Sequence, residues 1–309
     1  MNLENKYLSF VIPIYINDSR YVNFLKECIE SLKKQTDSKW YAFFIDDCSP
    51  ISDVKKILIN ESELDSRIKP IFLQKRISTG ECRNIGIQEA KKYDSPIIMF
   101  NDADDLSHKR RVEVVRKKMA SDECDVLYAN FIPIDENSID LPKVPSAIEE
   151  ILEALKTPPE GKNCWIDFST KTGYVNITSS TNVKTSLALL EPFPDSYISE
   201  DMHTWFRYSA RGNLEYSSLF PTRYRIPSFV RRQSSERYTL DFNKEKYLMD
   251  KDGFEKALNI YLGFNKIEKE NLKFIRIQFL LRLAMSFAMN DRLDLVKKIA
   301  KEILEFEEK

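Results

Sequence analysis

The chain has 309 residues, of which 42% are hydrophobic and 31% charged. This composition is typical of folded globular proteins and excludes the disordered and fibrous classes. Lysine and arginine almost balance aspartate and glutamate, giving a formal net charge of -1, so no overall positive field exists to hold a nucleic-acid backbone and we expect no nucleic-acid partner.

Cysteine usage and the N-terminal segment point to a reducing compartment. The five cysteines are odd in number and widely spaced and form no CxxC pair, which argues against a disulfide framework and a zinc site. The first residues lack a basic leader with a cleavage site, and the most apolar helical stretch, Phe279 to Met289, is interrupted by Arg282. We therefore expect a cytoplasmic protein.

Short apolar runs alternate with helical patterns through the first 130 residues, which is typical of βαβ units. This pattern predicts a doubly wound, mainly parallel α/β sheet, whose ligands bind beyond the carboxyl ends of the strands. The expected strands are Leu8–Ile14, Trp40–Ile45, Ile68–Leu73, Ile97–Phe100 and Val126–Ala129.

The pattern weakens after the fifth expected strand. From Pro133 to Thr172 the chain has several prolines and one helical stretch, Ala147–Leu155, which indicates an excursion over the surface. Regularity returns near Val175, and residues 242–309 carry apolar side chains at helical spacing. We predict a main domain over residues 1–240, divided near residue 130, and a helical C-terminal region over residues 241–309.

Three carboxylates follow the fourth expected strand within four positions, at Asp102, Asp104 and Asp105. Because like charges repel, such a cluster needs either solvent or a cation, and carboxylate oxygens select Mg²⁺ or Mn²⁺. The alternative is a solvated turn that caps the helix expected near His108. The position of this carboxylate cluster at the carboxyl end of a strand favours a functional site.

A second acidic pair, Asp46 and Asp47, follows the second expected strand. An acidic residue at this position of a doubly wound sheet accepts hydrogen bonds from a nucleotide's base or ribose. The alternative is an N-cap for the helix expected near Ser52.

A glycine-containing turn opens the next helix and carries Arg76 and Arg83. Helix N-termini and guanidinium groups both favour anions, so this segment is a candidate for binding phosphate groups. A basic helix face in water is the alternative.

Together these clusters resemble glycosyltransferase family 2 of the GT-A fold, because the pieces occur in family order over about residues 8–235. The family's pattern has a first strand, a V-D-D-G-S turn, an A-R-N-x-G helix, a D-x-D-D segment and an E-D-x-x-x-W-x-R segment. The matching pieces here are Phe10–Tyr15, Phe44–Ser49, Cys82–Gly86, Asp102–Asp105 and Ser199–Arg207.

The resemblance implies a nucleotide-sugar-binding half in residues 1–130, an acceptor-side half in residues 131–240, and a set of roles for single residues. Asp201 is the implied catalytic base. Asp104 is the chief implied metal ligand, with Asp102 close to the ribose or the metal and Asp105 as a further candidate ligand. The implied donor contacts are Pro13, Tyr15, Asp47 and Arg83, to which the basic turn adds Arg76.

Two departures from the family's pattern bear on the donor. The segment Arg76–Gly80 stands where members often have Asn-x-Gly-x-Ser. Gln233 stands where many members have a histidine that reaches the metal or the diphosphate, so either Gln233 or water takes that place. We therefore assign the diphosphate contacts to Arg231 and Arg232.

The chemistry of sugar transfer agrees with these roles. Displacement at an anomeric carbon needs a base for the acceptor's proton and a positive charge for the departing diphosphate. A single carboxylate facing the acceptor implies inversion of configuration. A helix cap is the alternative for Asp201, and His203, two residues later, is a weaker candidate for the acceptor cleft.

Several side chains of the second half are candidates for the acceptor side. Four aromatic residues suit stacking on sugar rings or core packing equally: Trp165, Tyr174, Tyr197 and Trp205. The hydroxyl-rich segment 176–181 either lines the acceptor side or forms an edge strand with an N-cap.

We predict an inverting, Mg²⁺- or Mn²⁺-dependent enzyme of the hexosyltransferase type that moves a sugar from a UDP-sugar to a hydroxyl of a saccharide or glycolipid. The resemblance implies a role in bacterial surface polysaccharide or lipopolysaccharide synthesis. The alternatives are a nucleotidyltransferase acting on a sugar phosphate, which usually has a glycine-rich, lysine-bearing loop after the first strand, and a non-catalytic sugar-binding relative.

The C-terminal helices carry Lys297, Lys298 and Lys301 beside an apolar face. We expect a solvated cap over the domain. Peripheral contact with the inner face of the membrane and homo-oligomer formation through these helices are the alternatives.

Overall fold

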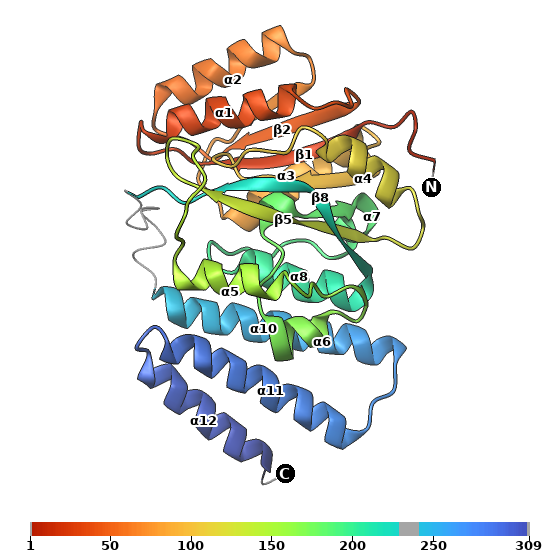
Figure 1. Cartoon of the computed structure of the whole chain (residues 1–309), viewed down its shortest axis with the longest axis vertical. Coiled ribbons are helices and arrows are strands. Elements are labelled where there is room, and N and C mark those ends of the chain that lie inside the picture. The colour runs from red at the N-terminus through yellow and green to blue at the C-terminus, as the bar shows by residue number, and fades with distance from the viewer. Residues whose placement is uncertain (1, 229–240, 308–309) are drawn as a thin grey trace.

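The computed structural model describes residues 2–228 and 241–307. A twisted sheet occupies the upper part of the molecule, with α1 (Tyr21–Lys33) and α2 (Ser52–Leu64) above it (Figure 1). Below the sheet lie α8 (Glu200–Arg211) and then α10 (Phe242–Phe264), α11 (Lys269–Ala288) and α12 (Leu293–Glu307) in successive rows (Figure 1).

Eight strands form one sheet in the described part of the chain, in the order β3-β2-β1-β4-β7-β5-β8-β6. The pairs β1–β2, β2–β3, β1–β4 and β5–β8 are parallel, whereas β7 runs antiparallel to β4 and β5, and β6 antiparallel to β8. The strands are β1 (Leu8–Ile14), β2 (Trp40–Asp46), β3 (Ile68–Phe72), β4 (Ile97–Phe100), β5 (Val126–Ile134), β6 (Gly161–Lys162), β7 (Asn182–Lys184) and β8 (Asn213–Arg225).

The predicted fold class is confirmed, and the first four strands agree with expectation to within one residue. The other four strands differ. Strand β5 continues to Ile134, past the point where the pattern weakens, and β6, β7 and β8 were not expected. Strand β8 contains Pro221 and pairs with β5 through a register shift between Ala129 and Phe131, so its residues do not alternate regularly in polarity.

The remaining helices flank the sheet or lie in the connections. They are α3 (Thr79–Lys92), α4 (Arg111–Met119), α5 (Ser146–Ala154), the short α6 (Trp165–Asp167), a π-helical turn (Phe168–Thr172), a 3₁₀ turn (Thr178–Ser180) and α7 (Thr185–Leu190). The helix expected at 147–155 is therefore present as α5.

Each face of the sheet has its own hydrophobic core, because successive side chains of a strand point to opposite faces. On β1, Phe10 and Ile12 join the core beneath α1, α2 and α4, whereas Val11 joins the core that contains α3 and α8. The C-terminal helices belong to this second core, where the rings of Phe254 on α10 and Phe279 on α11 stack with their centroids 4.1 Å apart. The domain boundary near residue 240 stays a prediction.

Within the described ranges 2–228 and 241–307, none of the helices combines the length and the apolar character needed to cross a membrane.

Helix α3 approaches β1 so closely that only glycine fits at one position. A Cβ atom on Gly86 would lie 2.4 Å from Cγ1 of Val11 and 3.0 Å from Cδ1 of Ile45. We expect Gly86→Ala to lower the free energy of unfolding by about 1 to 3 kcal/mol, measured by denaturant titration, because overpacking forces the helix away from the sheet. Gly263→Ala is the control, since nothing lies within 4 Å of its added Cβ. Equal stability of the two variants would contradict this packing.

Candidate active site

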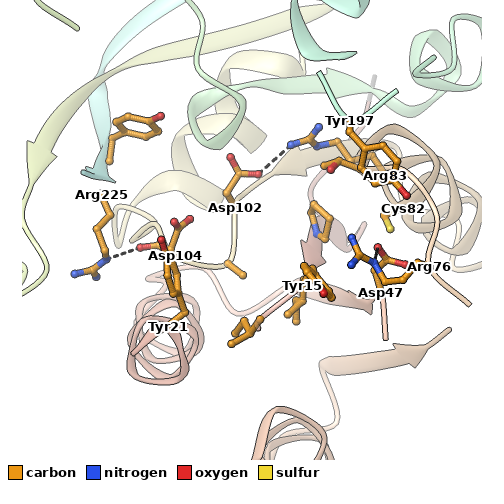
Figure 2. Close-up of a pocket in the computed structure, with 16 residues that line it drawn as sticks. Tyr15, Tyr21, Asp47, Arg76, Cys82, Arg83, Asp102, Asp104, Tyr197 and Arg225 are labelled. Carbon is orange, nitrogen blue, oxygen red and sulfur yellow. Dashed lines mark hydrogen bonds and ion pairs between the residues drawn. The ribbon is translucent and has the colours of Figure 1, made fainter. Parts of the chain in front are cut away.

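A cavity of about 350 Å³ opens beyond the carboxyl ends of β1, β2 and β4 (Figure 2). Seven of the residues proposed to contact the donor or the metal line it: Pro13, Tyr15, Asp47, Arg76, Arg83, Asp102 and Asp104. Asp105 and Asp201 are not among the lining residues. The cavity thus lies where the topology of a doubly wound sheet places ligands.

Tyr15, Asp47 and Arg76 form one interlocked cluster at one end of the cavity. The Arg76 guanidinium lies 3.3 Å above the centre of the Tyr15 ring, and its Nε donates a hydrogen bond of 2.7 Å to Oδ2 of Asp47. The other carboxylate oxygen of Asp47 accepts a bond of 2.8 Å from the backbone N–H of Ile77. The side chain of Asp47 is thereby oriented by the turn that precedes α3, and it does not cap α2.

Arg83 joins two segments that are far apart in the chain. Its Nη2 donates a hydrogen bond of 3.0 Å to Oδ1 of Asp102, which is drawn in Figure 2, and its Nη1 donates one of 2.7 Å to Oε1 of Glu200. Arg83 is buried with only 3% of its surface exposed. Burial opposes its charge, but the carboxylates of Asp102 and Glu200 outweigh that effect and raise the pKa of Arg83 above its ordinary value.

Asn84 brings the segment before α8 up to α3. Its Oδ1 accepts a hydrogen bond of 2.9 Å from the backbone N–H of Phe193, and its Nδ2 donates one of 3.0 Å to the carbonyl oxygen of the same residue. Gly80 adds a backbone approach, because a Cβ there would lie 2.0 Å from the carbonyl oxygen of Pro194. Arg83, Asn84 and Gly80 therefore share a structural role, which is to hold α8 and the segment before it against α3.

The aspartate segment after β4 is held from both sides by distant residues. The backbone N–H of Asp102 donates a hydrogen bond of 2.8 Å to Oγ of Ser179, and the carbonyl oxygen of Asp104 accepts one of 2.7 Å from Nε of Arg225. Ser179 lies in the hydroxyl-rich segment, which forms a buried 3₁₀ turn. That segment therefore supports the aspartates, and it is not an edge strand.

Asp105 faces the protein interior. Its Oδ1 accepts a hydrogen bond of 2.8 Å from the backbone N–H of Arg225, and burial, together with the charges of Asp104 and Asp102, raises its pKa well above the ordinary value. Among the side chains of the described residues, no group of three or more His, Cys, Asp or Glu is arranged to hold a metal ion. Of the three aspartates of this segment, Asp102 and Asp104 line the cavity.

Asp201 occupies the first turn of α8, next to Glu200. Its Oδ2 accepts hydrogen bonds from the Tyr174 hydroxyl at 2.9 Å and the Thr178 hydroxyl at 3.4 Å, and its Oδ1 accepts one from the backbone N–H of Met202 at 2.8 Å. The local bond to Met202 is of the kind expected for a helix start, whereas the bonds to Tyr174 and Thr178 come from outside the helix.

The pKa of Tyr224 reflects the negative charges of acidic residues from distant segments of the chain. Burial, followed by the negative charges of Asp105, Asp104, Asp102 and Asp201, raises the pKa of Tyr224 above its ordinary value. Tyr224 lines the cavity, so carboxylates separated by about one hundred positions in the chain act on a single phenol there.

The remaining candidates lie in different surroundings. Trp165 and Trp205 are buried in the core, and Tyr197 lines the cavity. Arg231, Arg232 and Gln233 lie outside the described residues. Glu200, Tyr224 and Arg225 were not predicted as site residues. Glu200 was visible beside Asp201, but the other two end a strand that the sequence did not reveal.

Comparison with known proteins decides the family. The Glycosyl transferase family 2 profile matches residues 9–175, which is more than half of the 309-residue chain. The chain belongs to glycosyltransferase family 2. The matched segment ends before α8, so Asp201 lies beyond it and its role is not assigned by this match.

Two relatives of this family member are named as uncharacterized glycosyltransferases. An uncharacterized glycosyltransferase of Methanocaldococcus jannaschii is 26% identical over 230 residues, which cover 73% of each chain. An uncharacterized glycosyltransferase of Rickettsia felis is 31% identical over 135 residues, which are 43% of this chain and 21% of that protein. The chain therefore spans about a fifth of the Rickettsia protein it matches.

Solved structures share the fold of this chain. A crystal structure of S. aureus TarS in complex with UDP-GlcNAc has a TM-score of 0.58 at 14% sequence identity, with 97% of this chain and 92% of the other covered. A complex of the same protein with UDP has a TM-score of 0.53 at 16% identity, with 97% of this chain and 91% of the other covered. The similarity includes the C-terminal helices, because it extends over nearly the whole chain.

His203 does not face the cavity. It is buried between α8 and α10, where its Nε2 lies 2.8 Å from Oδ2 of Asp252. Burial, assisted by the charge of Arg207, lowers the pKa of His203 to about 4. The neutral form is therefore the one that packs in the folded protein.

This burial predicts a pH dependence of stability. The unfolded chain binds a proton at His203 below pH about 6.5, whereas the folded protein does so only near pH 4, so stability falls as the pH is lowered through this window. We expect a loss on the order of 2 kcal/mol in the free energy of unfolding, measured by urea titration at several pH values. His203→Gln should flatten this slope more than His108→Gln does, because burial lowers the pKa of both histidines but that of His203 to a larger extent. A slope unchanged in His203→Gln would contradict the assignment.

Proposed function

We propose that this protein is an inverting, metal-dependent glycosyltransferase that moves a sugar from a UDP-sugar to a hydroxyl of a saccharide or glycolipid. One observation carries the proposal. Arg83 links Asp102, at the cavity, to Glu200, the neighbour of Asp201, so that the aspartates of the donor side and the candidate base belong to one site.

The nucleotide base of the donor binds at the cluster of Tyr15, Asp47 and Arg76. Aromatic and guanidinium planes stack on bases, and a carboxylate accepts a hydrogen bond from the imide N–H of uracil. Both kinds of group lie within this cluster. The fold shared with TarS, which is known in complexes with UDP-GlcNAc and UDP, supports a uridine nucleotide as the donor's carrier.

The diphosphate lies toward Asp104 and Asp102. Magnesium is commonly bound by one or two protein carboxylates together with substrate phosphates. Of the three carboxylates that line the cavity, Asp47 is paired with Arg76, which leaves Asp102 and Asp104 for this role. When bound, Mg²⁺ or Mn²⁺ would offset the negative charge that develops on the departing diphosphate. Asp105, which is hydrogen-bonded in the interior, is the weakest of the three proposed ligands.

Asp201 takes the proton of the acceptor hydroxyl. The hydroxyls of Tyr174 and Thr178 orient its Oδ2, and a fixed carboxylate is what general-base catalysis requires. With a single base and direct displacement at the anomeric carbon, the configuration of the sugar inverts.

The acceptor and the pathway are proposed from family membership alone. We assign the enzyme to surface polysaccharide, lipopolysaccharide or glycolipid assembly on the cytoplasmic side of the membrane. Membership in glycosyltransferase family 2 disfavours a nucleotidyltransferase. The persistence of Asp102, Asp104 and Asp201 around one site disfavours a non-catalytic relative.

Two variants test the proposed metal ligand and the proposed base separately. Asp104→Asn should abolish Mn²⁺-dependent binding of UDP, whereas Asp201→Asn should bind UDP normally and lose sugar transfer by at least about a hundredfold. Calorimetry measures binding, and release of nucleotide from UDP-, GDP- and dTDP-sugars measures turnover. Asp53→Asn, on the exposed face of α2, is the charge-matched control. Transfer that persists at the normal rate in Asp201→Asn would refute the assigned base.

The base-binding cluster is tested with a matched pair of arginines. Arg76→Leu should raise the dissociation constant of UDP about tenfold, because it removes both the stacking partner of Tyr15 and the cation that orients Asp47. The Arg67 guanidinium likewise lies over an aromatic ring, that of Trp40, and pairs with a carboxylate, that of Asp65. Arg67 directly precedes β3, however, so it lies at the amino end of the strand, whereas the cavity lies beyond the carboxyl ends. Arg67→Leu should leave UDP affinity unchanged. If both variants bind UDP like the wild type, the base lies elsewhere.

A further inference from the structure

The residue before the acidic pair of α8 has an unusual backbone. Ser199 adopts φ 56° and ψ 21°, the left-handed region that residues with a Cβ seldom occupy. Helix caps are usually extended, and their side chains accept a hydrogen bond from the helix, but Ser199 makes no such cap bond. Its hydroxyl instead donates to Oδ1 of Asp250 on α10.

Asp250 is well placed to hold this turn. It is only 2% exposed, and its other oxygen accepts a hydrogen bond from Nζ of Lys246 one turn earlier on α10. A buried carboxylate needs such partners, so its position is determined by groups other than Ser199 as well. The bond to Ser199 therefore ties the start of α8 to a residue that α10 already holds in place.

Two more contacts bring α10 against the first turn of α8. Asp252 pairs with the ring of His203, and Gly253 packs against the backbone of the same residue, where an added Cβ would lie 2.7 Å from Cα of His203. The helix axis of α8 and the turn at Ser199 are thus both fixed by α10. The direction in which Glu200 and Asp201 leave the helix start follows from that turn.

We infer that Asp250 and Ser199 are positioning residues, through which the C-terminal helix α10 aims Asp201 at the acceptor. This inference rests on the proposed function, in which Asp201 is the base. Without the hydrogen bond to Asp250, an L-residue at position 199 relaxes toward the extended conformation of an ordinary cap. The first turn of α8 then rotates, and Asp201 moves away from the Tyr174 hydroxyl that orients it.

Two substitutions of Ser199 distinguish an effect on the backbone conformation at this position from an effect on the overall stability of the fold. Ser199→Ala removes the hydroxyl but keeps the cost of a positive φ, so we expect kcat to fall about tenfold with the KM for the donor unchanged. Ser199→Gly also removes the hydroxyl, but glycine adopts positive φ freely, so we expect it to recover most of kcat. A merely structural role would change the melting temperature, which glycine also recovers at a positive φ, but would leave the kcat of the folded Ser199→Ala protein unchanged.

The companion variants lie on α10. Asp250→Ala should lower kcat as Ser199→Ala does, again with normal affinity for UDP. Glu255→Gln is the matched control, because Glu255 lies on the same helix but pairs with Arg276 of α11 rather than with α8. It should keep the wild-type kcat.

The inference is overturned if Ser199→Ala retains the wild-type kcat, or if Ser199→Gly is as slow as Ser199→Ala. Failure of the proposed function gives a different result, because Asp201→Asn would then transfer sugar at the normal rate. If Asp201→Asn is inactive and Ser199→Ala is not impaired, the base stands and only the role of α10 is refuted. Melting temperatures of all variants confirm that the proteins compared are folded.

Discussion

The buried guanidinium of Arg83 is the interaction on which the rest of the site depends. A buried cation is tolerated when carboxylates pair with it, and Arg83 has two, Asp102 and Glu200. Separation of Glu200, whose side chain is as buried as that of Arg83, would leave a carboxylate without compensation in the interior. The loop after β4 and the start of α8 are therefore held together, which places the donor-side aspartates and the candidate base at one site.

Other contacts between distant segments complete this arrangement. Ser179 and Arg225 hold the two sides of the aspartate segment, and Asn84 holds the segment that leads to α8. Tyr174 orients Asp201 from a third direction. The residues proposed to meet the substrate are thus supported by side chains of distant segments, of which Arg225 lines the cavity and Ser179, Asn84 and Tyr174 do not.

The sequence was sufficient for the first half of the fold because β1 to β4 are short, apolar and separated by amphipathic helices. It also pointed to Asp47, Arg76, Arg83, Asp102 and Asp104, which line the cavity and lie at or near the ends of elements that the pattern revealed, whereas Tyr15 was implied by the family resemblance. Strand β8 was not predicted, because Pro221 and the register shift interrupt the alternation of its residues. Its last two residues, Tyr224 and Arg225, were therefore not predicted as part of the site. The pairing of Arg83 with Glu200 spans 117 positions, which no local periodicity reports.

The contact between α8 and α10 was equally hidden, because spacing shows that a helix has an apolar face but not which helix that face meets. The C-terminal region therefore looked like an appendage in the sequence. In the structure its helices share a core with α8, and α10 contacts the turn that precedes Asp201.

A crystal structure of the protein with UDP and Mn²⁺ tests the account most directly. We predict the uracil ring beside Asp47 and Arg76, the diphosphate and the ion at Asp104, and Asp201 across the cavity with the Arg83 bridge intact. A nucleotide bound at another surface, or an Asp201 side chain directed away from the terminal phosphate, would contradict it.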